Sequence, residues 1–359
     1  MKIIYVGSYN AGEILTGPEK VSKRIFEEYA KIDRTLFVQY FQDGRKYSKY
    51  KKLFGKEKTN EVNGSEVLML GIFRMLFHIV KLKPDIIHIL SFNRFAAFLY
   101  IVKIFLRVKV FYTLNGIIRH ENKYYNKESA LTVVKNIISE NIIIYLSDRV
   151  FYLSEFSRRI LYIYFKPDRA KLTMVRNGLD NCFIDFTPQE NLNKERNSLV
   201  FIGNIDQKEK GFEFLIRSLS TLDYKVKLYA IDSSGKAQRF VDFIKPEINI
   251  VDKMSPDKMI EFLKSKSIVV APSEYDTFSI SSLEAISCGL YPVLTRQTGL
   301  SEFIGSFINV SLVNYNDHNS LGEILNGLIN SKVNKYRSFN SKEFSWNMVF
   351  NKYYLCYYR

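Results

Sequence analysis

The stretch SIVVAPSEYDTFSISSLEAISCGLYPVLT, residues 267–295, decides the fold of the second half of this chain. Residues 267–271 form a short β-branched run, typical of a buried parallel strand. A polar loop and a helical segment follow, and Gly289 ends the helix. Residues 291–295 then form the next strand. The stretch therefore predicts a right-handed βαβ unit whose loop lies at the carboxyl ends of the strands.

Two carboxylates, Asp276 and Glu284, stand eight positions apart in this loop and helix. Thr277 or Ser279 can cap the helix, and the first amides of a helix form a ready anion site. Eight helical residues rise about 12 Å, roughly the span from a sugar across a diphosphate to a ribose. The pattern thus favours a bound sugar nucleotide: one carboxylate binds sugar hydroxyls, the other binds ribose hydroxyls, and the diphosphate lies between them.

The whole stretch resembles the donor-site signature of glycosyltransferase family 4, a Glu, seven residues and a second Glu after a Pro-Ser pair. Glu284 stands where the family has its ribose-binding Glu, and Asp276 stands at the first position, one methylene shorter. The resemblance implies that Asp276 holds the donor sugar. It also assigns donor contacts to a run of four residues: Thr277, Phe278, Ser279 and Ile280. The alternative is an ordinary βαβ unit with two solvated acids.

A second donor element is expected in FIGNIDQKEKGFEFLIRSL, which begins at Phe201. A strand ending in Gly203, a polar loop and Lys210 at a helix start form a diphosphate cradle. Family members carry an Arg just after the Gly, and a Lys before the helix. Lys210 matches that Lys, whereas Asn204 stands where the Arg is expected, which weakens leaving-group stabilisation. Otherwise Lys210 is a solvated residue at a helix start.

The first half shows a looser match. SYNAGEILTGPEKVSKRIF, from Ser8, resembles the family's Gly-rich loop near the donor phosphate, with Gly17 and Pro18 where Gly-Gly is frequent. Gly17 is equally well explained as a turn residue. In VFYTLNGIIRHENKYY, Asn115 occupies the position of a family His beside the reacting sugar. Asn can bond a sugar hydroxyl but cannot carry a proton.

His120 and Glu121 follow Asn115 closely and are candidates to reach the acceptor, or are polar residues on a surface loop. His88, in PDIIHIL, is expected to be structural. Asn177, in MVRNGLD, matches a family Asn-Gly segment between domains and is assigned to turn geometry. The resemblance therefore names Asp276, Glu284, Asn115 and His120 as catalytic candidates.

Most of the positive charge lies in the first half. The chain has a formal net charge of +15, and residues 1–180 hold 31 Lys or Arg against 17 Asp or Glu, a net of +14. Such a surface favours anionic partners. The densest run, residues 43–58, interleaves basic and aromatic residues. As a loop, this run either lies on an anionic membrane surface or is solvated, and the sequence favours neither alternative. No recognised motif supports nucleic-acid binding.

The length of 359 residues and a hydrophobic content of 47% suit two α/β domains. The first half alternates strands and helices, and TPQENLNKERN (187–197) marks a boundary before a second alternating set. We expect a GT-B fold, two Rossmann-like doubly wound domains facing across a cleft. The predicted domains are 1–185, the acceptor domain, and 197–342, the donor domain. A C-terminal helix, residues 343–359, resembles the family helix that crosses back to the first domain.

We expect a cytoplasmic protein, peripheral at the inner face of the plasma membrane at most. The three cysteines are scattered, the apolar N-terminal run is too short for a signal peptide, and there is no apolar stretch of eighteen residues. The resemblance implies a retaining transferase that moves a sugar from a UDP- or GDP-sugar to a glycan or lipid-linked glycan acceptor. Bacterial capsule or O-antigen assembly is the expected setting. No metal or other cofactor is implied, since the chain lacks an Asp-x-Asp motif.

Two other functions remain open. A catalytically silent sugar-nucleotide binder of the same fold fits the departures at Asn204, Asn115 and Asp276. A sugar-nucleotide epimerase of GT-B fold would release free sugar and nucleotide without an acceptor, but it needs further acid and base residues. The sequence specifies neither the base, the sugar, the acceptor nor the oligomeric state.

Overall fold

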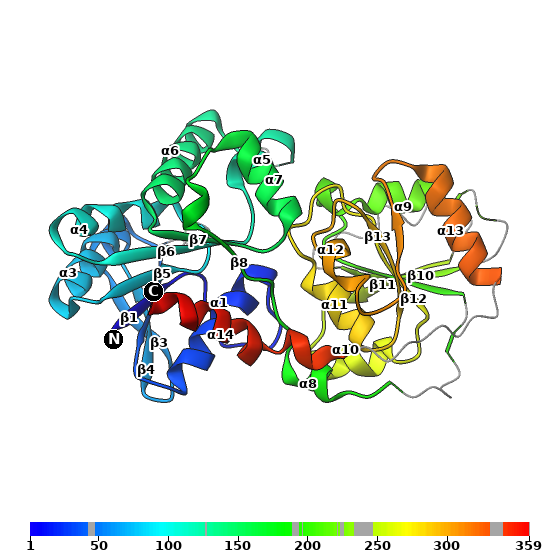
Figure 1. The fold of residues 1–359 in the computed structure, drawn as a ribbon, viewed down its shortest axis with the longest axis horizontal. Coiled ribbons are helices and arrows are strands. Elements are labelled where there is room, and N and C mark those ends of the chain that lie inside the picture. Colours follow the sequence, from blue (N-terminus) through cyan, green and yellow to red (C-terminus); the bar gives the residue numbers. More distant parts are fainter. Residues whose placement is uncertain are drawn as a thin grey trace. The chain divides into compact units, whose positions relative to one another are not determined.

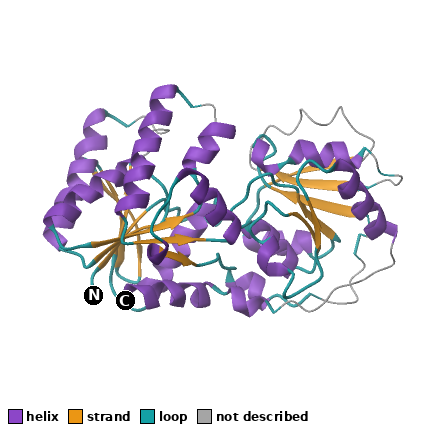
Figure 2. Ribbon diagram, turned by 45° about the horizontal axis from the view of Figure 1, so that its top comes forward, coloured by secondary structure: helices purple, strands orange, loops and turns teal. Residues whose placement is uncertain are grey.

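A computed structural model gives the fold of the chain and describes residues 1–41, 47–125, 128–188, 194–195, 197–220, 222, 226–232, 247–330 and 340–358. The chain divides into two compact units, each an α/β unit with one sheet covered by helices (Figures 1 and 2). The first unit holds residues 1–153, 157–177 and 346–359, and the second holds 154–156 and 178–345. Residues 43–46 of the basic run and residues 189–193 and 196 of the predicted linker lie outside the described residues.

The first unit follows the predicted alternation of strands and helices. Its elements are β1 (Ile3–Val6), α1 (Gly17–Ala30), β2 (Leu36–Tyr40), α2 (Lys49–Phe54), β3 (Lys56–Val62), β4 (Ser65–Leu70), α3 (Ile72–Leu82), β5 (Ile86–Ile89), the 3₁₀ turn η1 (Arg94–Phe98), α4 (Leu99–Phe105), β6 (Lys109–Leu114), α5 (Ile118–Tyr124), α6 (Ala130–Leu146), β7 (Arg149–Tyr152), α7 (Glu155–Tyr164), which begins in the second unit, β8 (Leu172–Met174) and α14 (Trp346–Tyr357).

The sheet of this unit runs β3-β4-β2-β1-β5-β6-β7-β8, and all pairs are parallel except β3 with β4. Side chains alternate across it, so Ile4 and Val6 of β1 point to the face covered by α3, α4, α6 and α7, and Tyr5 points to the other. That second face is covered by α1 and α14, where Tyr5 contacts Phe26 and Tyr29. The core is thus two layers, one on each side of the sheet.

The C-terminal helix α14 belongs to the first unit, as predicted from the family. Its Tyr357 hydroxyl lies 2.7 Å from Nδ1 of His88, and Nε2 of His88 lies 2.9 Å from the Thr113 hydroxyl. Tyr353 also contacts His88 ring to ring, at 5.4 Å between centroids. Because these groups are fully buried between sheet and helix, His88 has a structural position.

Three features of the first unit differ from the sequence-based expectation: the basic run, the strand β4, which was not predicted, and the helix α5. The basic run was expected to be a loop, but its described part forms α2 and the antiparallel edge strand β3. β3 reads KEKTNEV, which is too polar to show as a strand by pattern, and its pairing with the apolar β4 stabilises it. The short helix α5, after β6, was also missed.

The second unit contains β9 (Ser198–Ile202), η3 (Lys208–Lys210), α9 (Phe212–Leu219), β10 (Lys227–Asp232), β11 (Glu247–Asp252), α10 (Pro256–Leu263), β12 (Ile268–Ala271), α11 (Ile280–Ser287), β13 (Tyr291–Thr295), α12 (Ser301–Ile304), β14 (Ser311–Val313) and α13 (His318–Asn330). Its sheet is entirely parallel in the order β11-β10-β9-β12-β13-β14. The predicted βαβ unit is thus β12, α11 and β13, in which Gly289 adopts φ 87° after the helix.

The chain passes into the second unit at Gly178, earlier than the predicted change of domain at 185–197. α8 (Asn181–Asp185) contacts α10 and α11, and the Leu179 N–H donates to the Phe344 carbonyl at 2.7 Å. The segment that leaves the second unit, including η5 (Ser341–Phe344), is therefore hydrogen-bonded to the segment that enters it.

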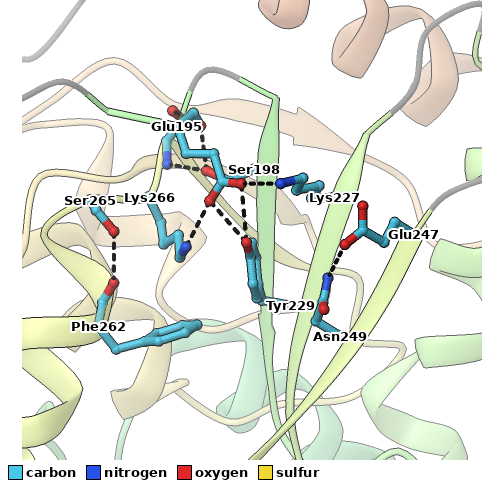
Figure 3. A network of polar contacts seen from close by, with 10 residues as sticks. Glu195, Ser198, Lys227, Tyr229, Glu247, Asn249, Phe262, Ser265 and Lys266 are labelled. Atoms are coloured by element: carbon cyan, nitrogen blue, oxygen red, sulfur yellow. Dashed lines mark hydrogen bonds and ion pairs between the residues drawn. The ribbon is translucent and has the colours of Figure 1, made fainter.

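A polar network joins the amino ends of β9 and β10 to the segment before β12 (Figure 3). The Glu195 carboxylate accepts from Lys266 Nζ at 2.7 Å and from the Tyr229 hydroxyl at 3.0 Å, and it forms an ion pair with Lys227 at 3.2 Å. Burial raises the pKa of Glu195, but these hydrogen bonds outweigh burial and the net pKa is lowered. Because parallel strands place functional loops at their carboxyl ends, this network at the amino ends is structural.

Candidate active site

The donor residues predicted in the second unit lie in loops at the carboxyl ends of β9 and β12. Lys210 closes the turn η3 and its Nζ lies 2.8 Å from Oδ2 of Asp276, which stands in the loop after β12. The Asp276 side chain is 12% exposed and that of Lys210 is 29% exposed. The second oxygen of the carboxylate, Oδ1, accepts the N–H of Phe278 at 3.1 Å. Asp276 therefore holds both a cation and the backbone of its own loop.

The loop after β12 is fixed by backbone contacts. The Asp276 carbonyl accepts the N–H of Gly299 at 2.8 Å, and the Phe278 carbonyl accepts that of Leu300 at 2.9 Å. The Ser154 hydroxyl donates to the Thr277 carbonyl at 2.9 Å. Since Thr277 and Phe278 are 6% and 1% exposed, they are available to a ligand chiefly through their backbone.

The two carboxylates of the signature are not separated by a continuous helix. Ser279 adopts the left-handed region, φ 72° and ψ 74°, so α11 begins only at Ile280, and the Ser279 side chain does not cap the helix. The expected helical rise of eight residues is therefore wrong, because the first half of the interval is loop. Strain of this kind in a non-Gly residue is common at functional sites. It leaves the first amides of α11 outside the loop's own hydrogen bonding.

Glu284 lies in the second turn of α11 and is 6% exposed. Its negative charge adds to burial in raising the pKa of Cys288 to about 12. Burial, and then the negative charge of Asp180, raise the pKa of the Cys182 thiol in α8 to about 11, and Glu284 adds a smaller contribution. Both cysteines thus remain protonated thiols beside the predicted ribose-binding residue.

Asn204 and Gly203 form the turn after β9. The Asn204 side-chain oxygen accepts the N–H of Asp206 at 2.9 Å, which makes it a turn-forming residue in the place where the family has an Arg. Gly203 donates its N–H to the Ile231 carbonyl at 3.1 Å, and a Cβ there would lie 3.7 Å from Cγ of Lys210. Among the described residues of this loop, Lys210 is the cation that the structure places beside Asp276.

The first unit has a pocket of about 330 Å³ at the carboxyl ends of β1, β5 and β6. Residues that follow these strands and residues of α1 and α5 line it: Ser8, Thr16, Pro18, Glu19, Ser91, Phe92, Asn115, Gly116, Ile118 and Glu121. The lining combines hydroxyl, amide and carboxylate groups with the apolar side chains of Pro18, Phe92 and Ile118. Such groups suit a ligand rich in hydroxyls.

Asn115 lines this pocket, and its Nδ2 donates to the Leu90 carbonyl at 2.7 Å. A Cβ at Gly116 would strike Oε1 of Glu121, so the glycine allows that carboxylate to fold over the backbone. His120 is not in the lining; its Nδ1 lies 3.0 Å from the Tyr164 hydroxyl. Burial, and then the charge of Lys123, lower the pKa of His120, which keeps it neutral at pH 7.

Glu140, on α6, holds the start of α5 and was not predicted. Its Oε1 accepts the Ile118 N–H at 2.7 Å and its Oε2 accepts the Arg119 N–H at 2.9 Å. Burial raises the pKa of this carboxyl to about 7, against the opposing effect of the two backbone hydrogen bonds. The one acid in a helix rich in Ile and Val was the available signal.

Gly17 is the first residue of α1, and a Cβ there would meet nothing within 4 Å. Its neighbours Thr16 and Glu19 line the pocket and form a capping box, in which the Thr16 N–H donates to Glu19 at 2.8 Å. The pattern Thr-x-x-Glu before an amphipathic helix was the signal that could have identified them.

Comparison with known families assigns both halves of the chain. Residues 184–346 match the family described as "Glycosyl transferases group 1", and residues 57–181 match "Glycosyltransferase Family 4". The chain belongs to these glycosyltransferases. Its predicted membership and enzyme class are thereby confirmed.

Solved structures that match the whole chain share its fold. The sucrose-phosphate synthase from Thermosynechococcus elongatus has a TM-score of 0.78 at 13% identity and covers 100% of this chain and 98% of its own. Anabaena HepE in complex with UDP-glucose has a TM-score of 0.73 at 16% identity, with 99% of both chains covered. At such identities the match shows the fold alone, and it confirms the predicted GT-B class.

Curated relatives match over shorter stretches. An uncharacterised glycosyltransferase of Methanocaldococcus jannaschii, MJ1178, is 28% identical over 150 residues, 40% of this chain and 42% of the relative. An uncharacterised protein in the cps region of Klebsiella pneumoniae is 22% identical over 169 residues, 46% of this chain and 47% of the relative. The matches thus span less than half of these relatives.

No group of three or more His, Cys, Asp or Glu side chains could hold a metal ion in the described part of the chain. In the same residues, no helix has both the length and the apolar character needed to cross a bilayer.

Proposed function

We propose that this glycosyltransferase moves a hexosyl or N-acetylhexosaminyl group from a nucleotide-diphosphate sugar to an acceptor hydroxyl with retention of anomeric configuration. The observation that carries the proposal is the ion pair between Lys210, in the loop after β9, and Asp276, in the loop after β12. Family membership supports it, as does the placement of Glu284 within the helix that follows.

In the proposed donor complex, the first amides of α11 and the Lys210 ammonium hold the diphosphate. Glu284, in the second turn, accepts from ribose hydroxyls, and Asp276 accepts from a hydroxyl of the donor sugar. Gly203, Asn204 and Thr277, all in the second unit, are assigned to contact the donor through their backbone groups. Protein charge and a helix terminus stabilise the departing diphosphate, so the proposal includes no metal or other cofactor.

The reaction breaks the bond between the anomeric carbon and the diphosphate oxygen and forms a bond from the same face to the acceptor oxygen. The acceptor proton passes to the departing diphosphate. We assign the chain's own residues to positioning and charge stabilisation, because no pair of carboxylates flanking the bond is required. Asn115, in the pocket of the first unit, is assigned to hydrogen-bond a sugar hydroxyl.

We propose UDP as the first donor nucleotide to test, because HepE, whose fold matches over the whole chain, is described in complex with UDP-glucose. For the acceptor we propose a lipid-linked glycan of a bacterial surface polysaccharide. Two similarities support this setting: the relative in the Klebsiella cps region and the lipopolysaccharide outer core galactosyltransferase WaaB, which matches with a TM-score of 0.68 at 15% identity and 99% coverage of both chains.

The test is thermal stabilisation of the purified protein by UDP-, GDP- and ADP-sugars. A ligand at a hundred times its dissociation constant adds about 2.7 kcal/mol to the folded state. Selective stabilisation by one sugar nucleotide, lost in Glu284→Gln and kept in Glu323→Gln at an exposed position of α13, supports the donor site. Absence of any shift contradicts it.

The catalytically silent binder remains the second candidate, because Asn204 forms a turn in the place of the family's Arg. It predicts the same nucleotide stabilisation without sugar transfer to any acceptor. Product analysis with lipid-linked and free glycan acceptors separates the two: transfer with an unchanged anomeric configuration supports the retaining transferase. Nucleotide and free sugar released without acceptor would indicate the epimerase-like alternative.

A further inference from the structure

α3 in the first unit carries two apolar stripes rather than one. Met75 and Ile79 are fully buried against the sheet, whereas Phe73, Phe77 and Val80 leave 52%, 58% and 48% of their surface exposed. The exposed three stand at i, i+4 and i+7, which places them together on the side of the helix away from the sheet. An amphipathic surface helix normally presents polar residues there.

The neighbouring helices repeat this pattern. In α4, Leu99 is buried, while Ile101, Ile104 and Phe105 are 47%, 80% and 81% exposed. In α6, the side facing the sheet is buried and the opposite side carries an exposed stripe: Leu131, Val134 and Ile138, at 64%, 52% and 55%. Each exposed set again keeps i, i+3 and i+4 or i+7 spacing.

The three stripes belong to one layer. α3 contacts α4, α4 contacts α6, and all three helices pack their inner sides on the same face of the sheet (Figures 1 and 2). Their outer sides therefore point away from the sheet together. We call this surface, made by the outer sides of α3, α4 and α6, the outer helical face. Exposed apolar surface of this extent marks an interaction site.

The exposed charges on α3, α4 and α6 themselves are basic, and acids occur beside the helices, at Glu128 before α6 and at Asp148, which pairs with Lys103. α3 and α4 contain no Asp or Glu, and the one acid of α6, Glu140, is completely buried. Arg74, Lys81 and Lys135 are exposed on the same helices, and residues 86–120 of the chain include no acid at all. Long basic side chains beside apolar ones bury their stems and keep their charges in the interfacial layer of a membrane.

We propose that the outer helical face docks on a lipid bilayer containing anionic lipids, with the apolar stripes in the interfacial layer and the basic side chains on the headgroups. The biological reason for this docking rests on the proposed function, because a lipid-linked acceptor would be presented at the membrane surface. The basic run at 43–58 adjoins this face, because Phe54 of α2 stacks on Phe73 of α3 at 5.2 Å between ring centroids, but the apolar stripes themselves lie on α3, α4 and α6.

A second copy of the chain fits this face less well. A two-fold contact sets each surface against itself, and here it would bring Arg74, Lys81 and Lys135 of both copies together with no exposed carboxylate of α3, α4 or α6 to pair them. An anionic bilayer supplies both the apolar medium and the opposite charge.

The experiment is co-sedimentation of the full chain with vesicles of phosphatidylcholine alone or mixed with phosphatidylglycerol. The test variant is the double substitution Ile104→Glu and Phe105→Glu; both side chains are at least 80% exposed, so folding is unaffected. The matched control is Leu355→Glu, 62% exposed on α14 at the other face of the sheet. We expect binding to the mixed vesicles, at least about tenfold weaker for the double variant and unchanged for the control.

A third variant, Arg74→Ala with Lys81→Ala and Lys135→Ala, is expected to lose the preference for anionic vesicles and to retain the weaker binding to phosphatidylcholine. The proposal is overturned if the unmodified chain binds neither vesicle, or if the double variant binds as well as the control does. It is also overturned if the double variant converts a dimer to a monomer while vesicle binding is absent.

The same preparations are tested for stabilisation by UDP-sugars, which reports on the second unit. Vesicle binding without any nucleotide stabilisation supports the docking surface and contradicts the proposed function. Nucleotide stabilisation and transfer to a soluble acceptor without vesicle binding overturn the docking surface and leave the proposed function standing.

Discussion

The ammonium of Lys210 lies 2.8 Å from Oδ2 of Asp276, and Oδ1 of that carboxylate accepts the N–H of Phe278 at 3.1 Å. In the structure, therefore, the cation assigned to the donor phosphate and the acid assigned to the donor sugar are paired with each other. A bound diphosphate would compete with Asp276 for Lys210. The donor site is thus a preassembled ion pair that a ligand must rearrange.

Lys210→Met should weaken donor binding. Loss of a charged hydrogen bond to phosphate costs about 1.5–3 kcal/mol, or roughly tenfold to more than a hundredfold in affinity. Titration with the stabilising sugar nucleotide measures the effect. Lys258→Met, at an exposed position of α10, is the control for loss of one positive charge in the same unit. Equal donor affinity in the two variants would contradict the role of Lys210.

Asp276→Asn and Asp276→Glu separate the effect of the carboxylate charge from the effect of side-chain length. Asn keeps an oxygen for the Phe278 N–H but loses the charge that pairs with Lys210, so we expect a loss of about 1 kcal/mol in stability and at least about tenfold in kcat/KM. Glu keeps the charge and restores the family's length, so it should retain most of the activity. Steady-state kinetics with the identified donor tests both. Full activity of Asp276→Asn would remove Asp276 from the site.

Gly211→Ala should destabilise the second unit by about 2 kcal/mol or more, because Gly211 has φ 70° and a Cβ there would strike the carbonyl oxygen of Pro272. Gly327→Ala, in α13 with nothing within 4 Å, should instead stabilise the same unit by about 0.5–1 kcal/mol. Urea unfolding of both variants measures the two shifts. Opposite signs are expected, and a destabilised Gly327→Ala would contradict the comparison.

Most strands and long helices of both units could be predicted from hydrophobic periodicity, because apolar residues such as Ile86–Ile89 and Ile268–Ala271 carry a local signal; β4 and β14 were not predicted. The edge strand β3 could not, since its sequence is polar and its partner β4 supplies the apolar face. An edge strand of this kind is recognised only in its tertiary context.

Within the site, the sequence placed Asp276, Glu284 and Lys210 by a family spacing, but it could not show that Lys210 and Asp276, 66 positions apart, form an ion pair. Nor could it show that Ser279 is left-handed, because that conformation is imposed by the contacts of the preceding loop. Contacts between distant segments leave no local pattern in a single sequence.

His88 should make the stability of the first unit depend on pH. Burial lowers its pKa to about 3, whereas an unfolded His titrates near pH 6.5. The unfolded chain therefore takes up a proton below about pH 6.5 that the folded chain refuses. Stability is full above that pH and falls by about 1.4 kcal/mol per pH unit as the pH drops toward 3. Urea unfolding between pH 5 and 8 should show this slope as the difference between the unmodified chain and His88→Gln, because the other titrating groups act on both proteins. An equal slope in both proteins would contradict the assignment.

Glu140 acts in the opposite direction over part of the same window. Burial raises its pKa to about 7, so the folded chain binds a proton between pH 7 and about 4.5 that the unfolded chain has released. Its contribution to stability therefore rises as the pH falls through 7. Protonation also removes one acceptor from the Ile118 and Arg119 N–H groups, which loosens the start of α5 beside the pocket.

The resulting prediction is specific to the acceptor. The KM for the acceptor should rise as the pH falls below 7, and Glu140→Gln, which mimics the protonated carboxyl, should show the raised KM at every pH. Donor affinity should not change, because the donor residues lie in the other unit. Glu128→Gln, at an exposed position just before α6, is the control. If Glu140→Gln keeps the unmodified KM and its pH profile, then Glu140 only stabilises α5, and the pocket of the first unit is not shaped by its charge.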